Sequence, residues 1–137
     1  MCQIEQPSEN DQDLSLIKLM AKVAYKYLKK GQYEKSRQFY LRALHKCYSS
    51  KTIKNSFLTA SFLLRIAESS TMRSSVYDFE QCFEQVKQIY LLAKERDTSI
   101  LLNSLIDLAW ALCLKGRLDE VRLINHFVSQ VKEIDNE

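Results

Sequence analysis

Glycine and proline are nearly absent from this chain, which has two glycines and one proline among its 137 residues. Both residues mark tight turns and interrupt regular structure, so their scarcity indicates long helices and few β-turns. The one proline, Pro7, lies in a polar stretch before the first apolar run. We therefore predict an all-α fold, in a chain long enough to bury the core of one domain.

The sequence also lacks the segments that direct a chain into or across a membrane. No uncharged apolar run reaches the roughly 20 residues that cross a bilayer, and the polar, acidic start lacks the layout of a signal peptide. The four cysteines, Cys2, Cys47, Cys82 and Cys113, are scattered, with no C-x-x-C pair and no histidine at ligand spacing. Free thiols in a reducing compartment show this pattern. We expect a cytoplasmic protein.

Motifs of catalysis are missing as well. The chain has no glycine-rich phosphate loop, no H-E-x-x-H helix and no G-x-S-x-G turn. Its two histidines, His45 and His126, have no carboxylate three or four residues further on that would suggest a metal site. The prediction is a non-enzymatic protein without a cofactor or a metal.

Helical periodicity begins after a polar start. Residues 1–12 are acidic, and we expect them to form a flexible leader ahead of a single domain at 13–134. Apolar residues then recur at i, i+3 and i+4 from Leu16 to Leu28, the pattern of an amphipathic helix. The pattern stops at Gly31, which suits a helix C-terminus, and restarts at Tyr33. Two helices joined by so short a turn form an antiparallel hairpin.

The first hairpin recurs near the other end of the chain. The segment Val23–Leu44 aligns with Leu108–Ser129 at an offset of 85 residues, which pairs Gly31 with Gly116. An offset of this size leaves room for one more hairpin between the two copies.

A middle hairpin can be aligned with the outer two. Ala60 then matches Ala24 and Phe83 matches Tyr33, which requires about fourteen extra residues in the turn, around residues 70–78. The sequence thus predicts six helices in three hairpins, at about 14–48, 53–95 and 98–134.

Each unit resembles the tetratricopeptide repeat, a helix-turn-helix of about 34 residues with small and aromatic residues at set places. The first unit carries these residues at Ala24, Tyr27, Gly31, Tyr33, Tyr40 and Ala43. The third unit fits at Ala109 and Gly116, and the middle unit fits at Ala60, Tyr90 and Ala93. The proline that usually ends a unit is missing from all three. The alternative is an irregular helical bundle that contains one such hairpin.

The resemblance implies a short right-handed superhelix whose first helices line a concave groove that holds a peptide. The groove residues that it implies are Tyr25, Leu28, Phe57, Leu64, Ile106, Trp110, Cys113 and Leu114. The last four of these residues, Ile106 to Leu114, have support of their own. Their segment, "ILLNSLIDLAWALCL", is apolar nearly all round, and such a helix is buried on every face. The side that carries Trp110 would then be covered by a ligand, by a second copy, by the leader or by the last helix.

Positive charge is concentrated in the first hairpin. From Ser15 to Lys54 there are eleven lysines and arginines against one acid, Glu34, although the net charge of the chain is only +3. The expected basic rim of the groove consists of Lys18, Lys22, Lys26, Lys29, Lys30, Lys54 and Arg65. Such a stripe is either a solvated helix face or a surface for an acidic protein segment or a phosphate backbone.

The leading hypothesis is an adaptor or regulatory module that binds another protein or a peptide through an apolar groove with a basic rim. The alternatives are a nucleic-acid-associated protein that uses the basic first hairpin, and a homodimer formed through the apolar groove residues. A membrane partner is not expected.

Overall fold

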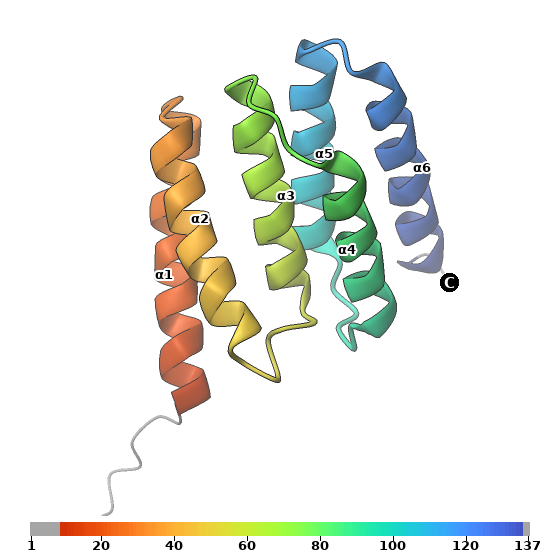
Figure 1. Ribbon diagram of the computed structural model, residues 1–137. Helices are drawn as coiled ribbons and strands as arrows, with labels where there is room; N and C mark the ends of the chain where they lie inside the picture. Colours follow the sequence, from red (N-terminus) through yellow and green to blue (C-terminus); the bar gives the residue numbers. More distant parts are fainter. Residues whose placement is uncertain (1–8, 136–137) are drawn as a thin grey trace, which may run out of the picture.

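The computed structural model describes residues 9–135, and the side chains of 12–132. Within these residues it contains six α-helices and no strand, so the all-α prediction is confirmed (Figure 1). The helices are α1 (Glu9–Lys29), α2 (Tyr33–Tyr48), α3 (Phe57–Met72), α4 (Phe79–Leu92), α5 (Ser99–Leu114) and α6 (Leu118–Asp135). None of these helices is long and apolar enough to span a lipid bilayer.

Two boundaries differ from the sequence prediction. The expected leader covers residues 1–12, but residues 9–12 already belong to the first turn of α1, and residues 1–8 lie outside the described part of the chain. The expected long turn at 70–78 is only 73–78, because α3 continues to Met72. The α4 helix then begins with Asp78 as its N-cap, whose side chain accepts a hydrogen bond from the Gln81 amide.

The three hairpins turn in the same way at the end of their first helices. Gly31, Ser74 and Gly116 all have a positive φ, at 76°, 58° and 73°. The residue after each donates its amide to a carbonyl five residues earlier, as in the bond of 2.8 Å from Ser75 to Ser70. This is the Schellman motif, in which a left-handed residue closes the helix. Among the described residues, Ser74 is the one non-glycine residue with a positive φ.

These three turns define the register of the repeat. They are spaced by 43 and 42 residues, so the middle hairpin needs no insertion, and the expected extra fourteen residues are wrong. Seven residues before each turn lies a buried alanine: Ala24, Ala67 and Ala109. The sequence alignment chose Ala60 for this place, two helical turns too early. The spacing also departs from the 34 residues of the tetratricopeptide repeat.

The second helices follow the same register. Ser36, Phe79 and Val121 are equivalent and buried, and so are Ala43, Val86 and Val128. Ser36 uses its hydroxyl to join the two helices of the first hairpin, donating a hydrogen bond of 2.8 Å to the Ala24 carbonyl.

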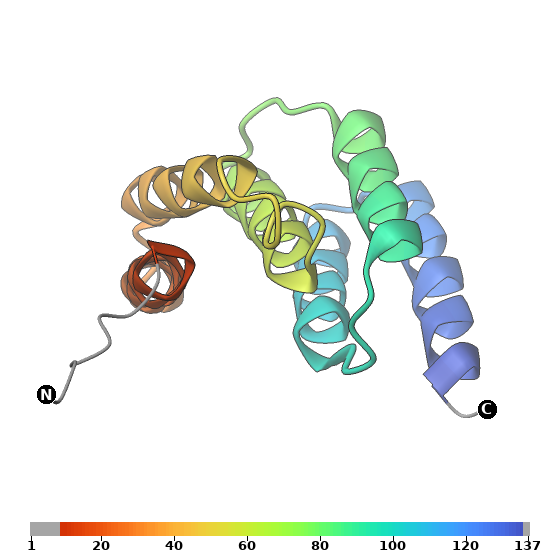
Figure 2. The ribbon, with the colours of Figure 1, turned by 90° about the horizontal axis from the view of Figure 1, so that it is seen from below.

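The helix α3 holds the molecule together. It contacts α2, α4 and α5, while α1 packs on α2 and α6 packs on α5. The largest buried side chains include Phe57 and Phe62, both on α3, and Phe62 lies against Tyr40 of α2 with ring centroids 5.8 Å apart. On the other side, Phe127 of α6 meets Phe83 of α4 edge to face. Figure 2 shows α1 and α5 on the same side of the molecule, with α3 set between them.

Candidate functional site

The candidate site is a groove bordered by α1 and α5, with α3 as its floor. Its first pocket, of about 520 Å³, lies at the N-terminal ends of these helices and is lined by Leu14, Lys18, Leu58, Ile100 and Asn103 among others. Its second pocket, of about 330 Å³, lies at their C-terminal ends. Its lining includes Leu28, Lys29, Glu68, Met72, Trp110 and Leu114. Both volumes are in the range of pockets that bind ligands.

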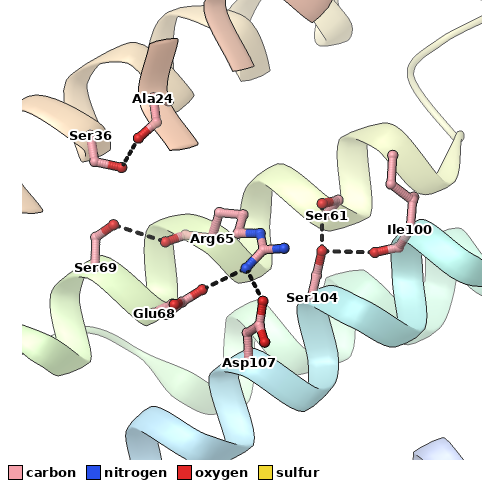
Figure 3. A network of polar contacts seen from close by, with 9 residues as sticks. All are labelled: Ala24, Ser36, Ser61, Arg65, Glu68, Ser69, Ile100, Ser104 and Asp107. Carbon is pink, nitrogen blue, oxygen red and sulfur yellow. Dashed lines mark hydrogen bonds and ion pairs between the residues drawn. The ribbon is translucent and has the colours of Figure 1, made fainter. Parts of the chain in front are cut away.

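A charged cluster lies on the floor of the groove, with Glu68 and Asp107 in the lining of the second pocket. Figure 3 shows its bonds. Arg65 of α3 donates through Nη1 to Glu68 Oε1 at 2.9 Å and to Asp107 Oδ2 at 2.5 Å. The guanidinium also lies over the ring of Tyr25 on α1, 5.3 Å from its centroid, and the ammonium of Lys29 lies 5.0 Å from the same ring. The cluster therefore links the three helices that form the groove.

Burial and pairing act in opposite directions on these groups. Burial raises the pKa of the Glu68 carboxyl, although the nearby Arg65 opposes that shift. Burial also disfavours the charge of Arg65, but its bonds to Asp107 and Glu68 outweigh this and hold its pKa above the ordinary value. A hydrogen bond with Tyr25 raises the pKa of Lys29. Near neutral pH, Arg65 and Lys29 therefore carry their positive charges in the groove.

Two serines fix α5 on α3 beside this cluster (Figure 3). The hydroxyls of Ser61 and Ser104 are 2.5 Å apart, and Ser104 also donates to the Ile100 carbonyl at 2.8 Å. Small buried residues at both places allow the two helices to approach closely. Hydrogen bonds as well as close packing therefore hold α5 against the floor of the groove.

The helix α5 exposes an apolar strip along the groove. Trp110 and Leu114 are 66% and 67% exposed, Ile106 is 39% exposed, and Cys113 is exposed beside them. We call Ile106, Trp110, Cys113 and Leu114 the α5 strip. The sequence predicted a side of this helix that its own hairpin partner and the preceding unit leave open, and the structure places all four residues there. Within the described residues no other helix covers them.

Three of the predicted groove residues belong to the core instead. Leu28, Phe57 and Leu64 are 6%, 2% and 1% exposed, so they offer a partner almost no surface, although Leu28 borders the second pocket. Phe57 stacks on Tyr90 of α4, with centroids 6.1 Å apart. A shift of seven residues keeps the same face of the helix, so the register does not explain this burial. Leu64 is equivalent to Ile106 and is buried because α5 packs on this side of α3. Tyr25 does reach the groove, with 39% of its surface exposed.

The predicted basic rim is divided by the structure. Lys18 and Lys29 line the two pockets, and Lys22 is exposed on the α1 turn between them. Lys26 and Lys30 are also exposed, but on the face of α1 next to the one that carries Lys18, Lys22 and Lys29. Lys54 lies elsewhere, beside Tyr48 and Gln85. Arg65 is buried, and is the centre of the charged cluster.

Sequence reasoning missed the two acids of this cluster. Asp107 is the one charge in "ILLNSLIDLAWALCL", which was a signal that this position has a partner. Glu68 stands in the middle unit where the outer units have Tyr25 and Trp110, 43 residues earlier and 42 later. Its place in the groove could not be seen until the register of the middle unit was known.

Another pocket, of about 420 Å³, lies between α4 and α6, with Phe79, Phe83 and Phe127 in its lining. All three rings are core residues, so this pocket is a surface depression over the core. Among residues whose side chains are described, no group of histidine, cysteine, aspartate and glutamate is arranged to hold a metal ion.

The fold and the groove define an all-α protein of three equivalent hairpins with an open face on its fifth helix. Comparison of the sequence with models of known families and with curated proteins, and of the structure with solved structures, finds no match.

Proposed function

We propose that this chain is a non-enzymatic, cytoplasmic helical-repeat module that binds another polypeptide in the groove. The observation that carries the proposal is the α5 strip, which exposes a tryptophan, a leucine and an isoleucine side by side. Contiguous apolar residues with a polar rim are typical of a surface that another molecule covers. Tryptophan is also among the residues that contribute most to binding at protein interfaces.

The equivalence of the hairpins supports the same proposal. Leu64 of α3 and Ile106 of α5 occupy the same place, 42 residues apart, but Leu64 is 1% exposed and Ile106 is 39% exposed. The difference arises because α5 packs on α3, while nothing in the described chain packs on α5 in the same way. The α5 strip is therefore a packing surface that lacks its neighbour.

The shared turn of the three hairpins supports a helical repeat over an irregular bundle. Because the spacing of the units departs from 34 residues, the tetratricopeptide resemblance supports only the position of the groove. The functional proposal depends on the α5 strip alone.

Site-specific photo-crosslinking tests this function. A photoreactive phenylalanine analogue replaces Ile106 at the edge of the groove. In a matched control it replaces Leu91, which is 74% exposed on α4 and is not part of the α5 strip. In cells of the native host we expect a crosslinked polypeptide from position 106, absent from position 91 and lost when Leu114→Asp is added. Equal products from both positions, or none from position 106, would contradict the proposal.

A further inference from the structure

The two borders of the groove differ in character. On α1 the border carries Lys18, Lys22 and Lys29, all exposed. On α5 the border is the apolar α5 strip. The floor adds one positive charge, on Arg65, and two negative charges, on Glu68 and Asp107, and both acids also interact with Lys29. A partner that fills the groove therefore meets positive charge on one side and apolar side chains on the other.

The repeat indicates which shape fits on α5. At the equivalent place on α3, the occupant is itself an α-helix, namely α5. It packs on Leu64 and joins α3 through Ser61 and Arg65. The corresponding residues on α5 are Ile106, Asn103 and Asp107, 42 residues later. A surface with this spacing presents ridges and grooves that match another helix. Recognition of an amphipathic helix through anchors at i, i+4 and i+7 uses the same geometry.

We propose that the groove binds an amphipathic α-helix of a partner protein, whose apolar face packs on the α5 strip and whose acidic flank faces Lys18, Lys22 and Lys29. This inference rests on the proposed function and adds the chemistry of the partner. From Asn103 in the first pocket to Leu114 in the second, α5 rises about 16 Å. A partner helix with apolar residues at i, i+4, i+7 and i+11 covers the same length.

Acidic residues are expected on the flank near α1 only. The first pocket also contains Glu95 and Asp97, which come from the connection that leads into α5. They would repel acids on the α5 side of the partner. The inferred helix therefore has its acids along one edge, and this pattern distinguishes it from a helix that is acidic all round.

Trp110 provides the readout, because it is the single tryptophan of the chain and two-thirds of it is exposed. The probe is a synthetic peptide of about 18 residues, long enough to form a helix. It has leucine at i, i+4, i+7 and i+11, glutamate along one flank, alanine elsewhere and no tryptophan. The matched peptide has lysine in place of glutamate.

The acidic peptide is expected to shift the emission of Trp110 to shorter wavelength. It should bind at least about tenfold more tightly than the lysine peptide, or about 1.4 kcal/mol. Added salt should narrow this gap, because it screens exposed charges. The variant with Lys18→Glu, Lys22→Glu and Lys29→Glu should reverse the preference. The control with Lys35→Glu, Arg42→Glu and Lys51→Glu has the same net charge and should keep the preference for the acidic peptide.

Other outcomes overturn the inference. Equal binding of the two peptides, a preference for lysine, or no response of Trp110 to the acidic peptide at about 1 mM would each do so. A blue shift that grows with protein concentration, without any peptide, would assign the α5 strip to a second copy. If the peptides fail while position 106 still crosslinks to a polypeptide, the proposed function stands and the helical, acidic partner does not.

Discussion

Ser74 has the same left-handed backbone conformation as Gly31, 43 residues earlier in the chain. At this conformation a side chain costs about 1 kcal/mol or more, and glycine costs almost nothing. We predict that Ser74→Gly stabilises the protein by about 0.5–1 kcal/mol, since the exposed bond from Lys115 to the Ser74 hydroxyl is weak by comparison. Urea unfolding measures the change.

A neighbouring serine provides the control. Ser75 has no positive φ, so Ser75→Gly adds freedom to the unfolded chain and should be neutral or destabilising. If Ser74→Gly destabilises the protein as much as Ser75→Gly, the equivalence of the three turns is wrong.

The same turn explains which parts of the fold could be predicted from the sequence. Helical periodicity and two turn glycines were enough for six helices in three hairpins. The register of the middle hairpin was not predictable, because Ala60 and Ala67 are both small, both buried and seven residues apart. Seven residues are nearly two helical turns, so either alanine fits the pattern. Ser74 sets the register of the middle hairpin, and its positive φ cannot be read from the sequence.

The error in register displaced the predicted groove residues of α3 by two turns along nearly the same face of the helix. On α5, where the register was right, the exposed strip was predicted residue by residue. On α3, Phe57 and Leu64 were predicted in the groove, but Glu68 and Met72 line it instead. The charged cluster was beyond sequence reasoning for another reason: Arg65 and Asp107 are 42 residues apart, and only the packing of α5 on α3 brings them together.

Arg65 is expected to be essential to the floor of the groove. The side chains of Arg65 and Glu68 are 11% and 12% exposed, so removal of the cation leaves a buried carboxylate without its partner. We predict that Arg65→Met costs about 2–4 kcal/mol in the free energy of unfolding. Arg122→Met is the control, because its ion pair with Asp119 is exposed and should contribute less than about 0.5 kcal/mol. Comparable losses in the two variants would contradict the assignment.

Glu68 is expected to make stability depend on pH. Because burial raises its pKa in the folded protein, folding favours the protonated form, and this contribution is lost as the pH rises through the folded pKa. Glu68→Gln cannot titrate. The stability of the wild type relative to this variant should therefore fall as the pH rises above about 4, the ordinary range of a glutamate pKa. Urea unfolding of both proteins across this range gives the difference.

Asp97 provides a control of opposite sign. The side chain and the amide of Ser99 both donate to its carboxylate, which lowers the pKa of Asp97. Its contribution is present above its unfolded pKa and is lost as the pH falls. The stability of the wild type relative to Asp97→Asn should therefore rise with pH. Two curves with the same slope would show that the pKa of Glu68 is not raised.

The cysteines are expected to differ in reactivity. Cys113 is exposed on the α5 strip, whereas burial raises the pKa of the Cys82 thiol to about 12 and also raises that of Cys47. In a Cys2→Ser background at pH 8, we predict one fast-reacting thiol with Ellman's reagent, and three after denaturation. Cys113→Ser should remove the fast phase. A helical peptide bound in the groove should slow it, which gives a second measure of occupancy. Fast reaction of Cys82 would contradict the described packing of α4 on α3.

Trp110 distinguishes a docking surface from a part of the core. Replacing a buried tryptophan with alanine costs about 3–5 kcal/mol, because the cavity adds to the lost transfer energy. Trp110 is 66% exposed, so we predict that Trp110→Ala changes the free energy of unfolding by less than about 1 kcal/mol. Leu112→Ala is the buried control on the same helix and should cost about 2–5 kcal/mol.

If Trp110→Ala costs as much as Leu112→Ala in the isolated monomer, then a segment of the chain itself covers the α5 strip. In that case the groove is closed to a partner, and both the polypeptide-binding function and the acidic helix lose their basis. A small loss of stability, combined with loss of crosslinking from position 106, is the result that an open docking surface requires.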